Sequence, residues 1–281
     1  MDKILLQFYG WLILTFLSCF FLIPNLFYHT NNTINYLLIK TLITINNKKP
    51  KTVEIYQHKG NLIIMMDDGW QSQYVVGYQY MRKKGLRGSI AVITNYIDQP
   101  NYLTLGNLLQ LYHDDWDILN HTHNHTNLAK YDYDKQKKDI EKAYHWLNKR
   151  GFNNGNILIF PHGQYNNQTI KIMDKLNIIS GRGITDGFND KYIDDFYQIR
   201  IKNVLSNTKP EAVFTWIEQT IAENLTLILL FHKLEKITDH TLMQYDIQNF
   251  QKIIDYIAEQ KQNLNIITFS DWIYINKYLN Y

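Results

Sequence analysis

The densest group of metal-binding side chains in the sequence lies in the segment Asn120–Leu128, which reads NHTHNHTNL. His121 and His125 are four residues apart, so one helical turn would place both imidazoles on one face. In an extended segment His121, His123 and His125 would share a face instead. Either conformation can hold a divalent metal, provided that a carboxylate from elsewhere completes the set.

Asp67 and Asp68 are the candidates for that carboxylate, because they follow a short apolar run, Asn61–Met66, and precede Gly69. Successive residues at the end of a strand point in different directions, so one aspartate can bind metal while its neighbour faces a substrate. A carboxylate beside a metal-bound water can accept the proton as the water attacks. Two His and one Asp leave coordination positions open, as catalytic zinc sites do.

Two further polar groups follow apolar runs. His232 comes directly after Leu225–Phe231, and an imidazole there can protonate a leaving group near neutral pH. Pro161-His162-Gly163 comes directly after Asn156–Phe160, and backbone N–H groups in this loop can polarise an oxyanion. Each pattern alone is common in ordinary strand-to-loop turns, so the prediction depends on their occurring together.

The elements that must position these residues alternate along the chain. Strands are predicted at 61–66, 87–94, 116–119, 156–160, 178–184, 225–231 and 264–269, and helices at 71–84, 103–112, 134–149, 169–176, 211–223 and 246–260. This alternation is typical of the α/β class, with a parallel sheet or a (β/α) barrel. Functional groups in such folds gather at the carboxyl ends of the strands, where all the polar groups named above lie.

Composition narrows the class of protein. With 45% hydrophobic and 20% charged residues, the 281-residue chain is that of a folded globular protein. A formal net charge of +3, carried by scattered basic residues, does not favour a nucleic-acid partner. The single Cys excludes a disulfide framework and a Cys-rich metal site.

The N-terminal segment predicts export. Phe8–Ile23 carries no charge, and with its flanks the apolar run reaches the ~20 residues that span a bilayer. Lys3 favours an N-terminus inside the cell. We therefore predict a signal anchor over 1–28, a juxtamembrane stalk over 29–51 and a catalytic domain over 52–281. The protein would be a single-pass membrane protein with its domain outside the cell. Alternatives are a cleaved signal peptide, which would release the domain, and a lipoprotein modified at Cys19.

From about Leu62 to Trp272 the chain resembles the NodB-homology polysaccharide deacetylases, a family of metal-dependent carbohydrate esterases. The resemblance depends on four motifs in order: Met66-Asp67-Asp68-Gly69, His121-Thr122-His123-Asn124-His125 with Leu128 downstream, Pro161-His162-Gly163, and Leu230-Phe231-His232. In the third motif His162 replaces the usual Tyr or Phe. Together the four motifs are specific, although each alone is weak.

The resemblance implies a distorted (β/α) barrel and hydrolysis of an N-acetyl or O-acetyl group on a polysaccharide. It assigns Asp67 as the catalytic base, His232 as the catalytic acid, and Asp68, His121 and His125 as ligands of one divalent metal. Zinc is the first expectation, with cobalt, nickel or iron as alternatives. Pro161, His162 and Gly163 would contact the substrate or its oxyanion. We expect a monomer.

Two departures from the family pattern matter. Many members carry an Arg shortly before the Pro-aromatic-Gly motif to hold the base, and Asn153–Ile159 has none, so Arg182 or Arg200 would have to substitute. No counterpart of the family's Trp-containing fourth motif is found either. The missing Arg and the form PHGQYN resemble the branch that deacetylates poly-β-1,6-N-acetylglucosamine.

The alternatives are an O-acetyl esterase acting on xylan or another glycan, and a non-catalytic, membrane-anchored carbohydrate-binding module. Aromatic residues near the motifs can stack on sugar rings in any of these functions: Trp70, Tyr74, Tyr96 and Tyr165.

Overall fold

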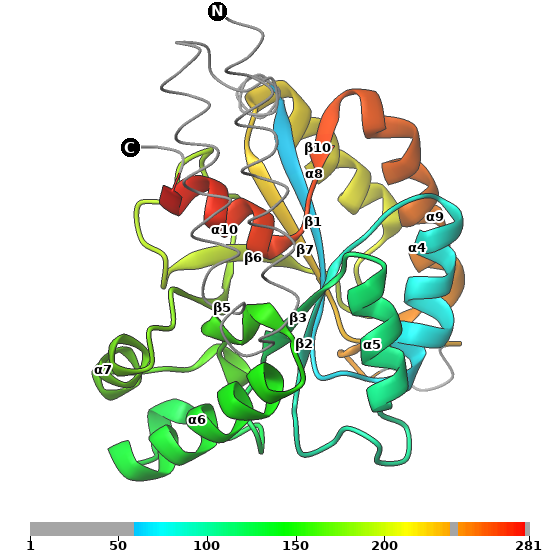
Figure 1. The fold of residues 1–281 in the computed structure, drawn as a ribbon. Helices are drawn as coiled ribbons and strands as arrows, with labels where there is room; N and C mark the ends of the chain where they lie inside the picture. Colours follow the sequence, from blue (N-terminus) through cyan, green and yellow to red (C-terminus); the bar gives the residue numbers. More distant parts are fainter. Residues whose placement is uncertain (1–58, 237–240, 279–281) are drawn as a thin grey trace, which may run out of the picture. The chain divides into compact units, whose positions relative to one another are not determined.

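The computed structural model describes residues 59–236 and 241–278 (Figure 1). The predicted anchor, 1–28, and the predicted stalk, 29–51, lie outside these described residues. Within the described ranges, no helix has both the length and the apolar character needed to cross a bilayer.

Eight parallel strands form the main sheet. They are β1 Gly60–Met66, β2 Ser89–Val92, β3 Asp117–Asn120, β4 Ile157–Ile159, β5 Ser180–Asp186, β6 Ile199–Asn203, β7 Thr226–Phe231 and β10 Leu264–Ile266. Their order is β10-β1-β2-β3-β4-β5-β6-β7, and β1 also pairs with β7. This last pairing closes β1 to β7 into a barrel, which confirms the predicted α/β class and the (β/α) barrel.

The barrel is distorted at β1, which has three partners. β1 pairs with β7 along Asn61–Met66, opposite Thr226–Phe231. On its other side, the first residues of β1 pair with β10 and only Met65 and Met66 pair with β2. The carboxyl ends of β1 and β7 are therefore held side by side in fixed register.

Helices follow most strands, and most of them cover the outside of the barrel (Figure 1). They are α4 Gln79–Lys83, α5 Leu105–His113, α6 Tyr133–Lys149, α7 Asn167–Lys175, α8 Pro210–Glu223, α9 Ile247–Glu259 and α10 Phe269–Tyr278. A π-helical turn, Gln73–Tyr78, precedes α4, and a small sheet of β8 Lys233–Glu235 and β9 Gln244–Asp246 follows β7. Several helices begin at side-chain caps that accept a backbone N–H, such as Asp132 before α6.

Alternate residues of β1 fill two different regions. Ile63 and Met65 point into the barrel interior, where Trp272 of α10 also packs. Leu62 and Ile64 belong to the layer between the sheet and the helices. Because packed side chains fill the interior, it is a core and not a channel, and chemistry is left to the strand ends.

The predicted elements agree with the structure to within a few residues, except at the end of the last strand, and four elements were not predicted: β6, β8, β9 and α10. β6 was not predicted, because only Ile199 and Ile201 of this short strand are buried and charged residues alternate with them. The predicted strand 264–269 is wrong at its end. β10 ends at Ile266, and α10 begins at Phe269, where backbone N–H groups bond to Ser89 and Asp117 at the amino ends of β2 and β3.

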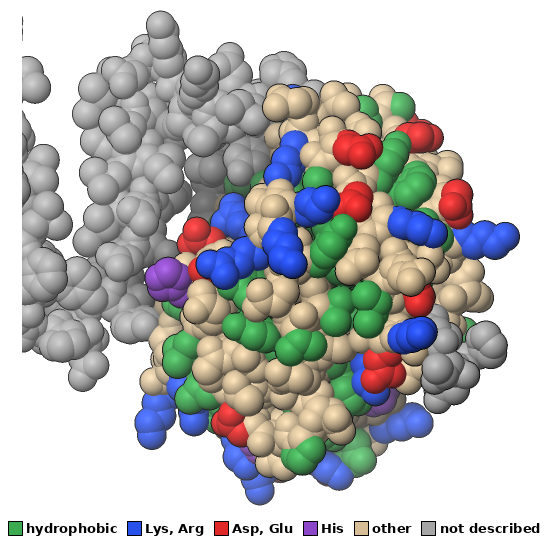
Figure 2. All heavy atoms as spheres, turned by 90° about the vertical axis from the view of Figure 1, so that its right-hand side faces the viewer, with side chains coloured by type: hydrophobic (Ala, Val, Ile, Leu, Met, Phe, Trp, Pro, Cys, Tyr) green, Lys and Arg blue, Asp and Glu red, His purple; other side chains and the backbone are tan. Residues whose placement is uncertain are grey.

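Charges are mixed on the face of the molecule that carries α4, α5 and α9. Lys and Arg side chains lie close to Asp and Glu side chains over much of this face (Figure 2). Two ion pairs are examples: Arg82 with Asp114 at 3.1 Å and Lys84 with Asp255 at 2.5 Å. Such a surface offers no continuous basic track there.

Candidate metal and catalytic site

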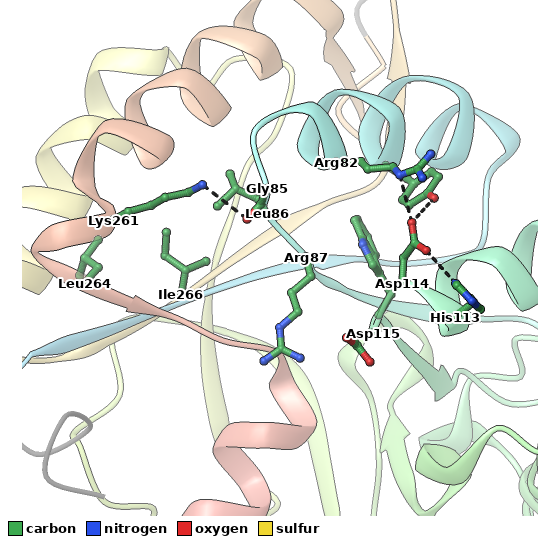
Figure 3. Close-up of a pocket in the computed structure, with 12 residues that line it drawn as sticks. Arg82, Gly85, Leu86, Arg87, His113, Asp114, Asp115, Lys261, Leu264 and Ile266 are labelled. Carbon is green, nitrogen blue, oxygen red and sulfur yellow. Dashed lines mark hydrogen bonds and ion pairs between the residues drawn. The ribbon is translucent and has the colours of Figure 1, made fainter. Parts of the chain in front are cut away.

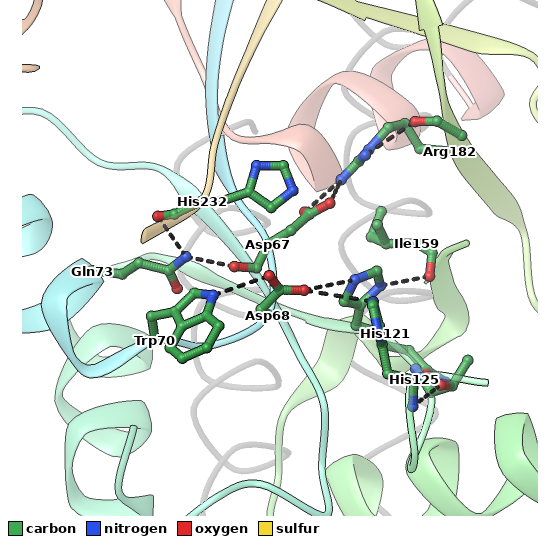
Figure 4. Close-up of polar contacts among 12 residues, drawn as sticks. Asp67, Asp68, Trp70, Gln73, His121, His125, Ile159, Arg182 and His232 are labelled. Atoms are coloured by element: carbon green, nitrogen blue, oxygen red, sulfur yellow. Dashed lines mark hydrogen bonds and ion pairs between the residues drawn. The ribbon is translucent and has the colours of Figure 1, made fainter. Parts of the chain in front are cut away.

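The carboxyl ends of β1, β3 and β7 bring the predicted site residues together (Figure 4). Asp67 and Asp68 follow β1, His121 follows β3, and His232 follows β7. His125 comes from the loop after His121. The structure therefore brings these five residues to one edge of the sheet, as the argument from strand ends predicted.

Asp68, His121 and His125 form a set that can hold a metal ion. One ligand atom from each lies within 4.8 Å of the others. His121 Nε2 is 3.4 Å and His125 Nε2 is 3.6 Å from the same oxygen, Oδ1 of Asp68. Two imidazole nitrogens and a carboxylate oxygen suit zinc and related divalent metals.

The two aspartates point in different directions because the backbone turns between them. The N–H of Asp67 still bonds to Phe231 O at 3.1 Å, as a continuation of β1. Asp68 and Gly69 then both take φ +78°, in the left-handed region. Such a conformation is strained for a non-glycine residue and occurs often at functional sites.

Hydrogen bonds to neighbouring residues orient two of the candidate ligands, His121 and Asp68. His121 Nδ1 lies 2.8 Å from Ile159 O, so a proton on Nδ1 would leave Nε2 free to face a metal. The indole Nε1 of Trp70 donates to Oδ2 of Asp68 at 3.0 Å, which leaves Oδ1 toward the histidines. Ligand histidines and carboxylates are commonly oriented in this way.

The charge states also fit a cation. Burial would raise the pKa of Asp68, but the bond to His121 and the nearby histidine charges lower it well below its usual range. Burial, together with the charge of His121, lowers the pKa of His125 to about 4, so this imidazole is neutral at pH 7. Burial lowers the pKa of His121, yet its contacts with the aspartates raise it more. A metal would replace the proton that His121 shares with Asp68.

Arg182 holds Asp67. Its Nη2 lies 2.5 Å from Oδ1 and 2.7 Å from Oδ2 of Asp67, and both side chains are almost fully buried. Burial raises the pKa of Asp67, but Arg182 and the neighbouring histidines outweigh burial and give a net lowering. Asp67 is therefore ionised. Of the two arginines that the sequence offered, Arg182 pairs with the candidate base Asp67, whereas Arg200 lies at an exposed position of β6.

His232 lies on the other side of Asp67, at the end of β7. The ring Nδ1 is buried and has no hydrogen-bond partner in the described part of the chain. Burial lowers the pKa of His232, and the charges of Asp67 and Asp68 raise it by less, so the net change is a lowering. A neutral imidazole whose ring is not tied to another side chain can bind and release a proton during a reaction.

Gln73 joins the two strand ends that carry the candidate base and acid. Its Nε2 donates to Asp67 O at 2.5 Å and to His232 O at 3.1 Å, and the side chain is fully buried. It lies in the π-helical turn, a local irregularity that is frequent at functional sites. No sequence motif pointed to Gln73.

Comparison with known proteins agrees with this geometry. Residues 55–179 match the polysaccharide deacetylase family model. Over 145 residues the chain is 30% identical to the poly-beta-1,6-N-acetyl-D-glucosamine N-deacetylase of Staphylococcus epidermidis, a match that covers 45% of this chain and 50% of that relative. Over these residues the chain resembles the polysaccharide deacetylase family. It spans about half the length of that relative.

Solved structures share the fold of this chain. A Streptococcus pyogenes deacetylase in complex with acetate is 23% identical, with a TM-score of 0.50 over 64% of this chain and 75% of the other. A CE4 family pseudoenzyme from Bacillus anthracis is 10% identical, with a TM-score of 0.50 over 76% of this chain and 66% of the other. Since the same fold occurs in a pseudoenzyme, catalysis must be argued from the side chains.

The Pro161-His162-Gly163 loop lies beside the candidate metal-binding set. The ring of the exposed His162 is 4.5 Å from that of His125, measured between centroids. Gly163 N–H donates to Phe160 O at 2.9 Å, and Pro161 has no N–H. An oxyanion donor from this motif would therefore have to be the N–H of His162, which has φ +56°.

The aromatic residues proposed for sugar stacking separate into two groups. Tyr74 stacks on Tyr78 and Tyr165 stacks on Phe160, so these two rings contribute to packing. Trp70 stacks on Tyr102 at 4.6 Å, and Tyr96 lies 4.8 Å from Tyr102, in the loops after β1 and β2. The second group adjoins Asp68 through Trp70 and is the better candidate for a sugar-binding surface.

A cavity of about 640 Å³ lies at the opposite end of the strands, lined by residues that precede β2, β3 and β10 (Figure 3). Its cations are already paired: Arg82 with Asp114, Arg87 with Asp271, and Lys261 with backbone carbonyls. This cavity is remote from the metal-binding set, and we assign it no part in the reaction.

Proposed function

We propose that this protein is a metal-dependent polysaccharide deacetylase that removes N-acetyl groups from an N-acetylglucosamine-containing polymer. The observation that carries the proposal is the separation of two aspartates into two environments. Asp68 faces two histidines whose ring nitrogens can share a metal with it, while Asp67 is paired with a buried arginine. Hydrolysis assisted by a metal needs both a ligand and a base.

The divalent metal would be held by Asp68, His121 and His125, and would supply a Lewis acid that activates water and polarises the acetyl carbonyl. Asp67, kept ionised by Arg182, accepts a proton from the attacking water. His232 donates a proton to the amine nitrogen as it leaves; because burial lowers its pKa, its protonated form is the stronger acid.

Poly-β-1,6-N-acetylglucosamine is the polymer that we propose as substrate. The supporting observation is the match to the Staphylococcus epidermidis enzyme, whose name states this substrate. The aromatic surface formed by Trp70, Tyr96 and Tyr102 beside the metal-binding set can contact a sugar ring. The alternatives remain an O-acetyl esterase and a carbohydrate-binding module.

Acetate release from a panel of glycans tests the proposal. The full-length protein, with its metal content measured, is incubated with poly-β-1,6-N-acetylglucosamine and with acetylated xylan, and His125→Ala serves as the metal-deficient control. We expect release from the amino-sugar polymer that depends on the metal. Faster release from xylan would indicate an O-acetyl esterase. Stoichiometric metal without release from any glycan would indicate a binding module.

We also propose that the enzyme acts outside the cytoplasm, attached through residues 1–28. The support is the uncharged run Phe8–Ile23. Removing residues 1–47 should give a soluble, active enzyme, because no proposed catalytic residue precedes Asp67. A truncated protein that stayed with the membrane fraction, or that lost its fold, would contradict this assignment.

A further inference from the structure

The loop that carries His125 adopts an unusual backbone conformation that its own sequence does not explain. Thr122 has φ +63° and His125 has φ +58°, so two non-glycine residues lie in the left-handed region within four positions. Each such residue costs on the order of 1 kcal/mol and persists only where surrounding contacts impose it. Something outside the loop must therefore fix it.

Asp139 of α6 supplies most of these contacts. Its Oδ1 accepts from the backbone N–H of Asn124 at 2.8 Å and from the Asn124 side chain at 2.8 Å, and its Oδ2 accepts from Thr126 N–H at 3.2 Å. Its backbone carbonyl accepts from His123 N–H at 3.2 Å. The Asp139 residue is 3% exposed, so water competes little for these bonds.

The rest of the loop's backbone is bonded by the motif itself. Thr122 N–H donates to Asn120 Oδ1 at 2.8 Å, and His125 N–H donates to Thr122 Oγ1 at 3.0 Å. All five consecutive N–H groups from Thr122 to Thr126 thus have an acceptor, and Asp139 provides three of them. Without Asp139, the N–H groups on both sides of His125 would lose their partners.

We propose that Asp139 is a positioning residue of the metal site, which holds His125 at ligand distance from Asp68 and His121. It touches neither metal nor substrate and acts only through the loop. The inference depends on the metal site proposed above. It predicts that Asp139 sets the affinity for the metal, since outer contacts of a ligand typically change metal affinity about 10- to 100-fold.

The substitution Asp139→Asn in the full-length protein tests whether Asp139 sets the affinity for the metal. The substitution keeps the shape but turns one acceptor oxygen into a donor, which must then face an N–H of the loop. We expect the dissociation constant for Co²⁺, measured by chelator competition, to rise about tenfold or more. The absorption spectrum of the cobalt-loaded protein should also change, because the geometry of His125 changes.

Asp117→Asn is the matched control. Asp117 is also a buried carboxylate with several hydrogen bonds, from Ser89, Asn154 and Ser270, but it lies at the amino end of β3. Replacing this carboxylate tests whether the loss of any buried carboxylate weakens metal binding. We expect Asp117→Asn to bind Co²⁺ as the parent does, with the parent spectrum.

Asn124→Ala keeps the proposal testable if Asp139→Asn does not fold. It removes the side-chain bond to Asp139 Oδ1 and the bond that Asn95 donates to Asn124, but keeps the backbone bond from Asn124 N–H, and we expect a several-fold weaker affinity for Co²⁺. Parent affinity and spectrum in Asp139→Asn, or in Asn124→Ala where the former cannot be made, would overturn the inference. An equal loss of affinity in Asp117→Asn would overturn it too. A parent protein that bound no Co²⁺ would instead refute the proposed function.

Discussion

Replacing Arg182 by Met should expose how much the buried ion pair with Asp67 contributes. Arg182 is 0% exposed and Asp67 3% exposed, so the variant leaves a carboxylate in the core without its cation. Unit charges about 4 Å apart attract by about 4 kcal/mol at an effective dielectric constant near 20. Removing one partner of a buried pair typically costs about 3–5 kcal/mol. We therefore expect Arg182→Met to lower the free energy of unfolding by about 4 kcal/mol at pH 7.

The loss should depend on pH in a defined direction. In the parent, Asp67 has a lowered pKa, so its stabilising contribution is present above the ordinary Asp pKa and is lost as the pH falls through the lowered value. In Arg182→Met burial is no longer opposed by the guanidinium, and the pKa of Asp67 rises. Protonation then relieves the buried charge, so the stability gap between parent and variant should already narrow as the pH falls toward the ordinary Asp pKa of about 4, and narrow further below it.

Urea denaturation of the metal-free full-length protein at pH 7 and pH 4 measures both effects. The double variant Asp67→Asn, Arg182→Met is the control, because it removes the unpaired charge and should recover roughly 2 kcal/mol at pH 7. Three results would refute the reasoning. They are a decrease in the free energy of unfolding of Arg182→Met below about 1 kcal/mol at pH 7, a stability difference between parent and variant that stays constant with pH, and a double variant that is no more stable than Arg182→Met.

His125→Ala should lose its metal on dialysis while keeping the fold, since His125 is neutral in the metal-free protein; metal analysis and circular dichroism test this. Asp67→Asn and His232→Ala should each lower kcat by about 10²–10⁴-fold and keep one metal per chain. If Asp67→Asn lost the metal, Asp67 would be the metal ligand and Asp68 the base. As the pH rises, kcat should fall when His232 loses its proton, and it should fall at a lower pH than for an ordinary imidazole because the pKa of His232 is lowered. The pH profile of His232→Ala should lack this fall. Gln73→Met should lower kcat by roughly 10- to 100-fold with little change in KM, because the two strand ends lose their common donor; an unchanged kcat would show that β1–β7 pairing is sufficient.

The sequence predicted where the site lies because strand ends can be recognised from apolar runs. Asp67 and His232 each stand directly after such a run and His121 stands two residues after the run 116–119, and parallel strands bring those ends to one edge. The conformation of the histidine loop was not predictable in this way. Neither a helix nor an extended segment forms, because Asp139 imposes a turn from a position 14 residues after His125.

Choosing between two arginines also required the structure. Arg182 and Arg200 both lie in strands, and nothing in the sequence shows which one points toward the barrel. Arg182 is buried beside Asp67, whereas Arg200 falls on the exposed side of β6. A change of one residue in either strand would exchange inward and outward positions, so side-chain direction depends on pairing register.

The pairing of β1 with β7 limits where related proteins can gain or lose residues. The candidate base and acid each stand one residue beyond a pair of strands matched along Asn61–Met66 and Thr226–Phe231. Adding one residue within β1 would turn its inward side chains outward and carry Asp67 away from His232. The connection from 187 to 198, between β5 and β6, contains no residue of the site. We expect relatives to differ in length in such connections and to preserve the number of residues within β1 and β7.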